Sequence, residues 1–104
     1  MKLARVILFT RNLATMTAFY RDVIGLPLKS LEKGWVEFDL LALHEGTGEA
    51  GTIKLVFGST EVAKTREELV ARGARMGKVK DFGGLVLCDG KDPDGNLFQI
   101  SNRA

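Results

Sequence analysis

The sequence Asp92-Pro93-Asp94-Gly95-Asn96 leads directly into Leu97-Phe98-Gln99-Ile100-Ser101, and this stretch decides the fold. Pro93 fixes φ for the second position of a β-turn and Gly95 can adopt positive φ, so the chain reverses there. The alternating residues that follow predict a strand. We expect the two aspartates of the turn to cap their own backbone, because a calcium loop would need further oxygen ligands ending in a Glu, which this sequence lacks.

The length and composition indicate one domain that spans residues 1–104. The net charge is +2 and the basic residues are scattered, so no nucleic-acid partner is indicated. The single cysteine, Cys88, excludes an internal disulfide framework, and we expect its thiol to be buried and inert. No segment is long enough to span a bilayer and the start lacks an apolar signal region, which predicts a cytoplasmic protein without a membrane partner.

The chain contains the same order of predicted elements twice, once in each half. A continuous apolar run, an amphipathic helix and shorter strands make up the first half, and the same order follows in the second. Neither half could bury its apolar sheet face alone. We therefore predict an α+β fold of two packed modules, 1–50 and 51–104, joined at the polar stretch 45–51. The expected strands are 3–10, 28–31, 35–39 and 40–44 in the first module, and 52–57, 76–79, 85–88 and 97–101 in the second.

The helices between these strands show apolar stripes that predict their buried faces. In the first helix, which Asn12 begins and Gly25 ends, the stripe is Leu13, Met16, Tyr20 and Val23, widened by Phe19 and Ile24. In the second, which Ser59 or Thr60 caps and Gly73 ends, it is Val62, Leu69 and Val70. The aromatic residues Trp35, Phe38 and Phe82 can line a pocket or belong to the core, and we favour the core.

One reversal lacks turn-forming residues. The segment Phe38-Asp39-Leu40-Leu41 passes from one predicted strand to the next without Gly, Asn or Pro. Three alternatives remain at this point: an unusually tight hairpin, a single long strand, or a loop that is missing from the chain.

The internal repeat, the stretch Ala18-Phe19-Tyr20-Arg21-Asp22-Val23-Ile24-Gly25-Leu26 and the late turn at Asp92 together resemble the vicinal oxygen chelate superfamily. This superfamily includes glyoxalase I, bleomycin-resistance proteins and extradiol dioxygenases. The resemblance covers nearly the whole chain. It implies two βαβββ modules whose strands form a curled mixed sheet around a cavity, usually in a homodimer.

The resemblance also points to four strand positions that carry metal ligands in the superfamily's enzymes, typically His, Glu or Gln. In this chain they fall on Arg5, Ala42, Lys54 and Gln99. Two cations, a methyl group and an amide do not make a divalent-metal site, because a ligand must offer a lone pair. We therefore expect no metal ion and no other cofactor.

Strand alternation places Arg5, Lys54 and Gln99 on one concave surface. This predicts a metal-free protein that binds an anionic small molecule, with Arg5 as a forked donor, Lys54 as a point charge and Gln99 fixing the orientation. The alternative is that the two cations lie at the rim or pair with Glu37 and Asp39. The predicted ligand-binding residues are Arg5, Phe9, Ala42, His44, Lys54, Val56 and Gln99.

Catalysis is left open by the sequence. His44, next to Glu45, is a weak candidate for a general acid or base, and a lone His beside a polar loop is more often a surface residue. A second hypothesis is thus an enzyme: a metal-dependent lyase or dioxygenase whose ligands lie in another register, or a metal-free isomerase that uses His44. A third is a structural or regulatory partner domain whose cavity is filled by its own side chains.

Overall fold

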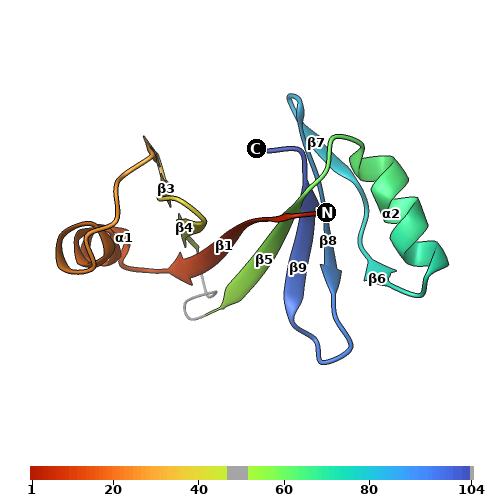
Figure 1. Ribbon diagram of the computed structural model, residues 1–104, viewed down its shortest axis with the longest axis horizontal. Helices are drawn as coiled ribbons and strands as arrows, with labels where there is room; N and C mark the ends of the chain where they lie inside the picture. The colour runs from red at the N-terminus through yellow and green to blue at the C-terminus, as the bar shows by residue number, and fades with distance from the viewer. Residues whose placement is uncertain (47–51, 104) are drawn as a thin grey trace. The chain divides into compact units, whose positions relative to one another are not determined.

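The computed structural model describes residues 1–46 and 52–103. The chain forms two compact units, which are called here the N-terminal unit, Arg5–Ile53, and the C-terminal unit, Met1–Ala4 together with Lys54–Ala104. Most of the polar stretch predicted to join the modules, 45–51, lies outside the described residues. Each unit builds its own piece of sheet and covers it with one helical segment (Figure 1).

The N-terminal unit follows a βαβββ plan (Figure 1). Its strands lie in the order β2-β3-β4-β1, with β4 parallel to β1 and antiparallel to β3. The helix α1 continues without a break into a short π-helical turn, η1. The elements are β1 (Leu3–Thr10), α1 (Leu13–Ala18), η1 (Phe19–Val23), β2 (Ser30–Glu32), β3 (Trp35–Glu37) and β4 (Leu41–Glu45).

The C-terminal unit repeats this plan. Its strand β9 lies parallel to β5 and antiparallel to β8. Two short strands, β6 and β7, both pair with β8, so one strand of the plan is split in two. The elements are β5 (Ile53–Gly58), α2 (Val62–Ala71), β6 (Arg75–Met76), β7 (Lys80–Phe82), β8 (Leu85–Lys91) and β9 (Leu97–Ser101). The predicted α+β architecture of two βαβββ modules is confirmed.

Each helical segment buries one face of its own sheet. In the N-terminal unit, Leu13, Met16 and Tyr20 pack on the buried residues Val36, Phe38 and Leu43. In the C-terminal unit, Val62 and Leu69 belong to a cluster with Cys88 and Ile100. Because side chains of a strand alternate between faces, the opposite face of each sheet remains for other contacts.

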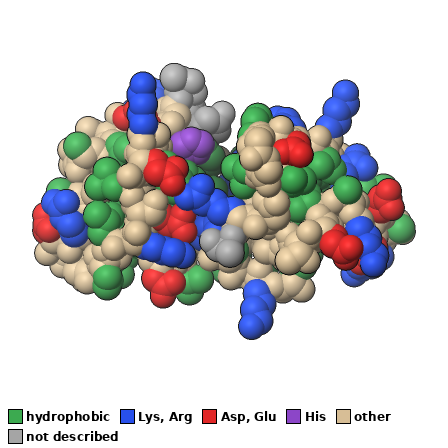
Figure 2. Space-filling view, turned by 90° about the horizontal axis from the view of Figure 1, so that it is seen from above, with side chains coloured by type: hydrophobic (Ala, Val, Ile, Leu, Met, Phe, Trp, Pro, Cys, Tyr) green, Lys and Arg blue, Asp and Glu red, His purple; other side chains and the backbone are tan. Residues whose placement is uncertain are grey.

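Several residues predicted as core are exposed. Val23 is 71% exposed, and Phe19 and Ile24 are exposed as well. They follow the change from α-helix to π-helix, where each turn contains an extra residue, so the predicted 3.6-residue stripe rotates away from the sheet. Leu26 packs on the core in their place. Hydrophobic side chains that stay on the surface are green in Figure 2.

Two further core predictions are wrong in the C-terminal unit. Val70 is exposed, because its neighbour Leu69 is the residue of this helical turn that packs on the core. Phe82 is 62% exposed, since it ends β7 at the tight turn through Gly83 and Gly84. Phe38, by contrast, is fully buried as predicted.

The turn at Asp92 forms as predicted. The Asp94 and Asn96 N–H groups donate to Asp92 Oδ1 at 2.9 and 2.8 Å, and Gly95 has a positive φ of 87°. The Asn96 side-chain amide donates to the other Asp92 oxygen, and this bond and those from the backbone lower the pKa of Asp92. Asp92 therefore caps its own backbone as predicted, whereas the Asp94 side chain makes no such bond within the described residues.

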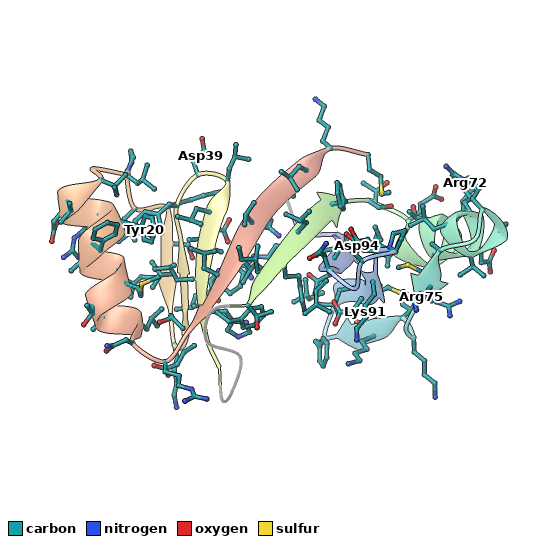
Figure 3. All side chains as sticks on the ribbon, turned by 90° about the horizontal axis from the view of Figure 1, so that it is seen from below. Tyr20, Asp39, Arg72, Arg75, Lys91 and Asp94 are labelled. Atoms are coloured by element: carbon teal, nitrogen blue, oxygen red, sulfur yellow. The ribbon has the colours of Figure 1, made fainter. Side chains whose placement is uncertain are left out.

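The reversal without turn residues is a tight hairpin between β3 and β4. The Phe38 N–H donates to the Leu41 carbonyl at 2.7 Å, so only Asp39 and Leu40 lie in the loop. Leu40 adopts φ of 60° and is the one residue other than glycine with positive φ in the part of the chain that the structure describes. The first of the three alternatives is therefore correct (Figure 3).

Replacing Leu40 by glycine is expected to stabilise the protein by about 0.5–1 kcal/mol. A residue with a Cβ pays roughly 1 kcal/mol or more for the left-handed conformation, whereas glycine adopts it freely. Leu40 is 58% exposed, so little packing is lost. Urea denaturation followed by circular dichroism measures the change. The matched control is Leu31→Gly in β2, also exposed, which should destabilise; a loss of stability at both positions would contradict the strain argument.

Candidate functional site

In the N-terminal unit, the sheet face opposite the helix collects four of the predicted ligand-binding residues. Strand β1 pairs with β4 so that Ile7 faces Ala42 and Phe9 faces His44. Register partners in neighbouring strands point to the same face, and Arg5 shares that face because it lies two residues before Ile7. Arg5, Phe9, Ala42 and His44 therefore lie on one surface, as predicted.

A buried ion pair lies at the centre of this face. The Arg5 Nε lies 3.7 Å from Glu37 Oε2, and the two side chains are only 4% and 5% exposed. Lys29 Nζ lies 3.5 Å from the same oxygen, and the Trp35 indole N–H donates to Glu37 Oε1 at 3.1 Å. Of the two carboxylates considered as partners for Arg5, Glu37 is the one that pairs, whereas Asp39 is exposed at the hairpin tip.

Aromatic rings flank the ion pair. The His44 ring lies 5.3 Å from that of Phe9 and 5.4 Å from that of Trp35, measured between centroids. Trp35 is the register partner of His44 in β3, so all three rings stand on the same face of the sheet. The ring planes are tilted by 35° between Phe9 and His44 and by 75° between Trp35 and His44, so they form an uneven aromatic cluster next to a charged group. Such a cluster suits a ligand that combines a ring with a charge.

The C-terminal unit carries a second polar group on the face opposite α2. Lys54 Nζ lies 3.3 Å from Asp89 Oδ1, and the Gln99 side-chain N–H donates to the same oxygen at 2.9 Å. Gln99 is the register partner of both Val56 in β5 and Asp89 in β8. The structure thus brings Lys54, Val56 and Gln99 together as predicted, around a carboxylate that sequence reasoning missed.

The two polar groups occupy equivalent positions in the repeat. Arg5 lies two residues before Ile7, the partner of Ala42, and Lys54 lies two residues before Val56, the partner of Gln99. In each unit a carboxylate sits opposite the second of these positions: Glu37 opposite Ala42, and Asp89 opposite Gln99. Arg5 of β1 is therefore matched by Glu37 of β3, and Lys54 of β5 is matched by Asp89 of β8.

The donor set does not fit a divalent metal ion. The four positions that the family resemblance assigns to chelating residues, Arg5, Ala42, Lys54 and Gln99, hold a guanidinium, a methyl group, an ammonium and an amide. A cation offers no lone pair to a metal. Across residues 1–46 and 52–103, no group of three or more His, Cys, Asp or Glu side chains is placed to bind a metal.

None of the helices in those ranges is long and apolar enough to cross a bilayer.

Cys88 lies in the core of the C-terminal unit. It is fully buried, and its thiol donates to the Gly77 carbonyl at 3.2 Å. Burial raises the pKa of Cys88, which disfavours the reactive thiolate.

We expect native Cys88 to react with iodoacetamide at least about tenfold more slowly than the same thiol in guanidinium chloride. Because folding raises the pKa of Cys88, the neutral thiol stabilises the folded protein. This stabilisation is fully present at pH values below the pKa of the unfolded thiol, about 8.5, and is lost as the pH rises through the pKa of the folded thiol. Mass spectrometry of quenched samples between pH 7 and 10 measures the labelling. Equal rates for the native and unfolded chains would contradict a buried thiol.

Comparison with known proteins identifies relatives of the whole fold. Residues 5–101 match the family model of the glyoxalase-like domain. No curated protein matches the sequence significantly.

Solved structures match over nearly all of the chain. A glyoxalase/bleomycin resistance protein/dioxygenase superfamily member from Vibrio splendidus 12B01 is 15% identical, with a TM-score of 0.70 over 93% of this chain and 95% of that one. Homoprotocatechuate 2,3-dioxygenase from Brevibacterium fuscum is 23% identical, with a TM-score of 0.72 over 97% of this chain. This chain spans only 36% of that dioxygenase. At such identities the likeness supports the fold alone.

Proposed function

The chain belongs to the glyoxalase-like domain family, and from this premise we propose that it binds a small organic anion without a metal ion. The ligand-binding residues of the proposal are Arg5, Phe9, Ala42 and His44 in the N-terminal unit, and Lys54, Val56 and Gln99 in the C-terminal unit. The observation that carries it is the equivalent placement of Arg5 and Lys54, both cations, at positions where chelating relatives would need a lone pair.

The cations at Glu37 favour an anion at the N-terminal group. Arg5 Nε and Lys29 Nζ lie 3.7 and 3.5 Å from the same oxygen, Glu37 Oε2, so two cations stand at one carboxylate. Lys54 and Asp89 cancel in the C-terminal group. Because Lys29 is exposed while Arg5 is buried, Lys29 can turn toward a ligand carboxylate without uncovering a buried charge.

The rings beside this charge favour an aromatic or bulky apolar body. Phe9, Trp35 and His44 contact one another on the same face as Glu37. An aromatic carboxylate would stack on these rings while its charge meets Lys29, the exposed cation of the group, and Arg5 supports the site from its buried position beside Glu37.

Isothermal titration calorimetry with benzoate, benzamide and benzylammonium tests the charge requirement, because the three probes share a ring and differ in charge. We expect benzoate to bind and the other two to bind at least about tenfold more weakly. The variant Lys29→Met should weaken benzoate binding. The control Lys33→Met, an exposed lysine in the turn after β2, should not. Benzamide or benzylammonium binding as tightly as benzoate would overturn the proposal.

Elemental analysis of protein purified without chelator separates binding from metal catalysis. The proposal expects no stoichiometric transition metal. Nickel, zinc, iron or manganese at one equivalent per chain would instead support a metal-dependent lyase or dioxygenase, and would contradict a metal-free site.

The proposal includes a homodimer. Phe19, Val23 and Ile24 are exposed on consecutive turns of one helical segment, and apolar side chains on adjoining turns are typical of surfaces that meet a partner. Light scattering after size exclusion should give twice the chain mass, and Val23→Lys with Ile24→Lys should give the chain mass. A wild-type protein that stays at one chain mass would contradict this part.

A further inference from the structure

A groove of about 620 Å³ runs along the edge strand β6 of the C-terminal unit and is lined by residues from both faces of the sheet. Its walls come from the second half of α2, from both residues of β6 and from the end of β8. None of the N-terminal group, Arg5, Lys29 or Glu37, contributes to it. Three basic side chains and three larger apolar ones define its chemistry: Arg66, Arg75 and Lys91, with Val70, Met76 and Leu97.

Two of the basic residues stand directly opposite each other. Arg75 in β6 is the register partner of Lys91 in β8, so their side chains leave the same face of the sheet, and Figure 3 shows both at this edge. Like charges directly opposite in an antiparallel pair are destabilising. Among residues 1–46 and 52–103, neither takes part in an ion pair, although Arg75 Nη2 donates to the Asp92 carbonyl at 3.3 Å. An anion between them would relieve the repulsion.

The third cation is held in place by the backbone. Arg66 Nε donates to the Gly77 carbonyl at 2.7 Å, which fixes the guanidinium at the groove wall. Asp89 is the acidic residue of the groove, and its Oδ1 already accepts from Lys54 and Gln99. The groove therefore carries a positive excess.

The remaining wall is apolar. Val70 is exposed on α2, and Met76 and Leu97 are half-buried. Exposed apolar surface next to paired cations suits a molecule with an anionic head and a hydrocarbon body. A purely hydrophilic anion would leave these apolar side chains exposed to water. An uncharged hydrocarbon ligand would not relieve the repulsion between Arg75 and Lys91.

We propose that this groove is a second binding site, which takes an amphipathic anion whose carboxylate lies between Arg75 and Lys91. Its alkyl chain starts at Leu97, on the same face as these cations, and passes over the edge strand β6 to Met76 and Val70 on the α2 side. The guanidinium of Arg75 supplies a planar fork for the carboxylate and Lys91 supplies a point charge. The site shares no basic residue with the N-terminal group, so it holds or fails independently of the proposed aromatic-anion site.

Titration with octanoate, acetate, octanol and octylammonium tests the head and the chain separately. Octanoate should bind, and acetate, octanol and octylammonium should each bind at least about tenfold more weakly. In ¹H–¹⁵N spectra, octanoate should shift the amide signals of Val70, Met76 and Gly90. Octanol binding as tightly as octanoate, or shifts confined to other parts of the chain, would overturn the proposal.

Methionine variants keep the long apolar stem and remove the charge. Lys91→Met and Arg75→Met should each lower octanoate affinity by about three- to tenfold, and the double variant by more. Both residues are exposed, so the variants should stay folded, which thermal melts check. Lys64→Met, on the exposed side of α2, is the matched control and should bind octanoate normally. Octanoate affinity that is unchanged in the double variant would contradict the site.

Lys29→Met separates the two proposals. It should weaken benzoate binding and leave octanoate binding unchanged, whereas Arg75→Met with Lys91→Met should do the reverse. Loss of both ligands in either variant would show that one site binds both, and would overturn the claim of a second site.

Discussion

Replacing Glu37 by alanine is expected to destabilise the protein by about 3–5 kcal/mol, because truncating one partner of a buried ion pair leaves the other charge in a low-dielectric interior. Glu37 accepts from the Trp35 indole and lies within 3.7 Å of Arg5 and 3.5 Å of Lys29. All these contacts are lost together. Guanidinium chloride unfolding, followed by tryptophan fluorescence and circular dichroism, measures the change in the free energy of unfolding.

A double variant separates the charge effect from the packing effect. Arg5→Met combined with Glu37→Leu removes both charges and keeps apolar volume, so it should recover most of the stability that Glu37→Ala loses. Glu32→Ala, which removes an exposed carboxylate from the neighbouring strand β2, should change stability by less than about 0.5 kcal/mol. If Glu37→Ala behaved like this control, the Arg5–Glu37 pair would not be a buried charge pair in solution.

Gly90→Ala is expected to destabilise the protein by about 1–3 kcal/mol through overpacking. A Cβ at Gly90 would lie 2.7 Å from Met76 Sδ, 2.7 Å from Phe98 Cζ and 3.0 Å from the Arg75 carbonyl oxygen. The Met76 side chain can move at little cost, but the Phe98 ring belongs to the packed core and the Arg75 carbonyl is backbone. The groove wall next to β6 would shift with them.

Gly58→Ala provides the matched control. Gly58 ends β5, its φ is not in the left-handed region, and a Cβ there would meet nothing within 4 Å. Urea denaturation followed by circular dichroism measures both variants, and the control should change the free energy of unfolding by less than about 0.5 kcal/mol. Similar losses for the two variants would show that glycine entropy, and not close approach, sets the cost at Gly90.

Local patterns predicted which residues share a face, because strand alternation has a strict period of two. The alternation predicts Arg5, Phe9, Lys54, Val56 and Gln99 on one concave surface. Within each unit the observed register agrees: Arg5 and Phe9 share a face in the N-terminal unit, and Lys54, Val56 and Gln99 share a face in the C-terminal unit. Turn chemistry was equally informative where it is specific, as at Asp92 and Gly95.

Cross-strand partners were harder to predict. Asp89 was missed because its pairing with Lys54 depends on the register of β8 against β9 and of β9 against β5, which no single segment encodes. A usable signal was present: Asp89 alternates with Leu87 and Lys91, which places a carboxylate on the face opposite the core residue Cys88.

Two departures from local rules also escaped prediction. The π-helical turn changes the period of the first helix, and an apolar stripe assigned at 3.6 residues per turn therefore includes Val23 wrongly. The loop at Leu40 adopts a conformation that its sequence disfavours, because pairing of β3 and β4 on both sides holds it there.

The split of one strand into β6 and β7 bears on how this protein avoids aggregation. These strands contain two and three residues, and within the C-terminal unit they pair only with β8. Short, interrupted edges that carry lysines, as at Lys78 and Lys80, offer few free backbone groups to a second chain. Fibril-like strand addition at this border is therefore disfavoured.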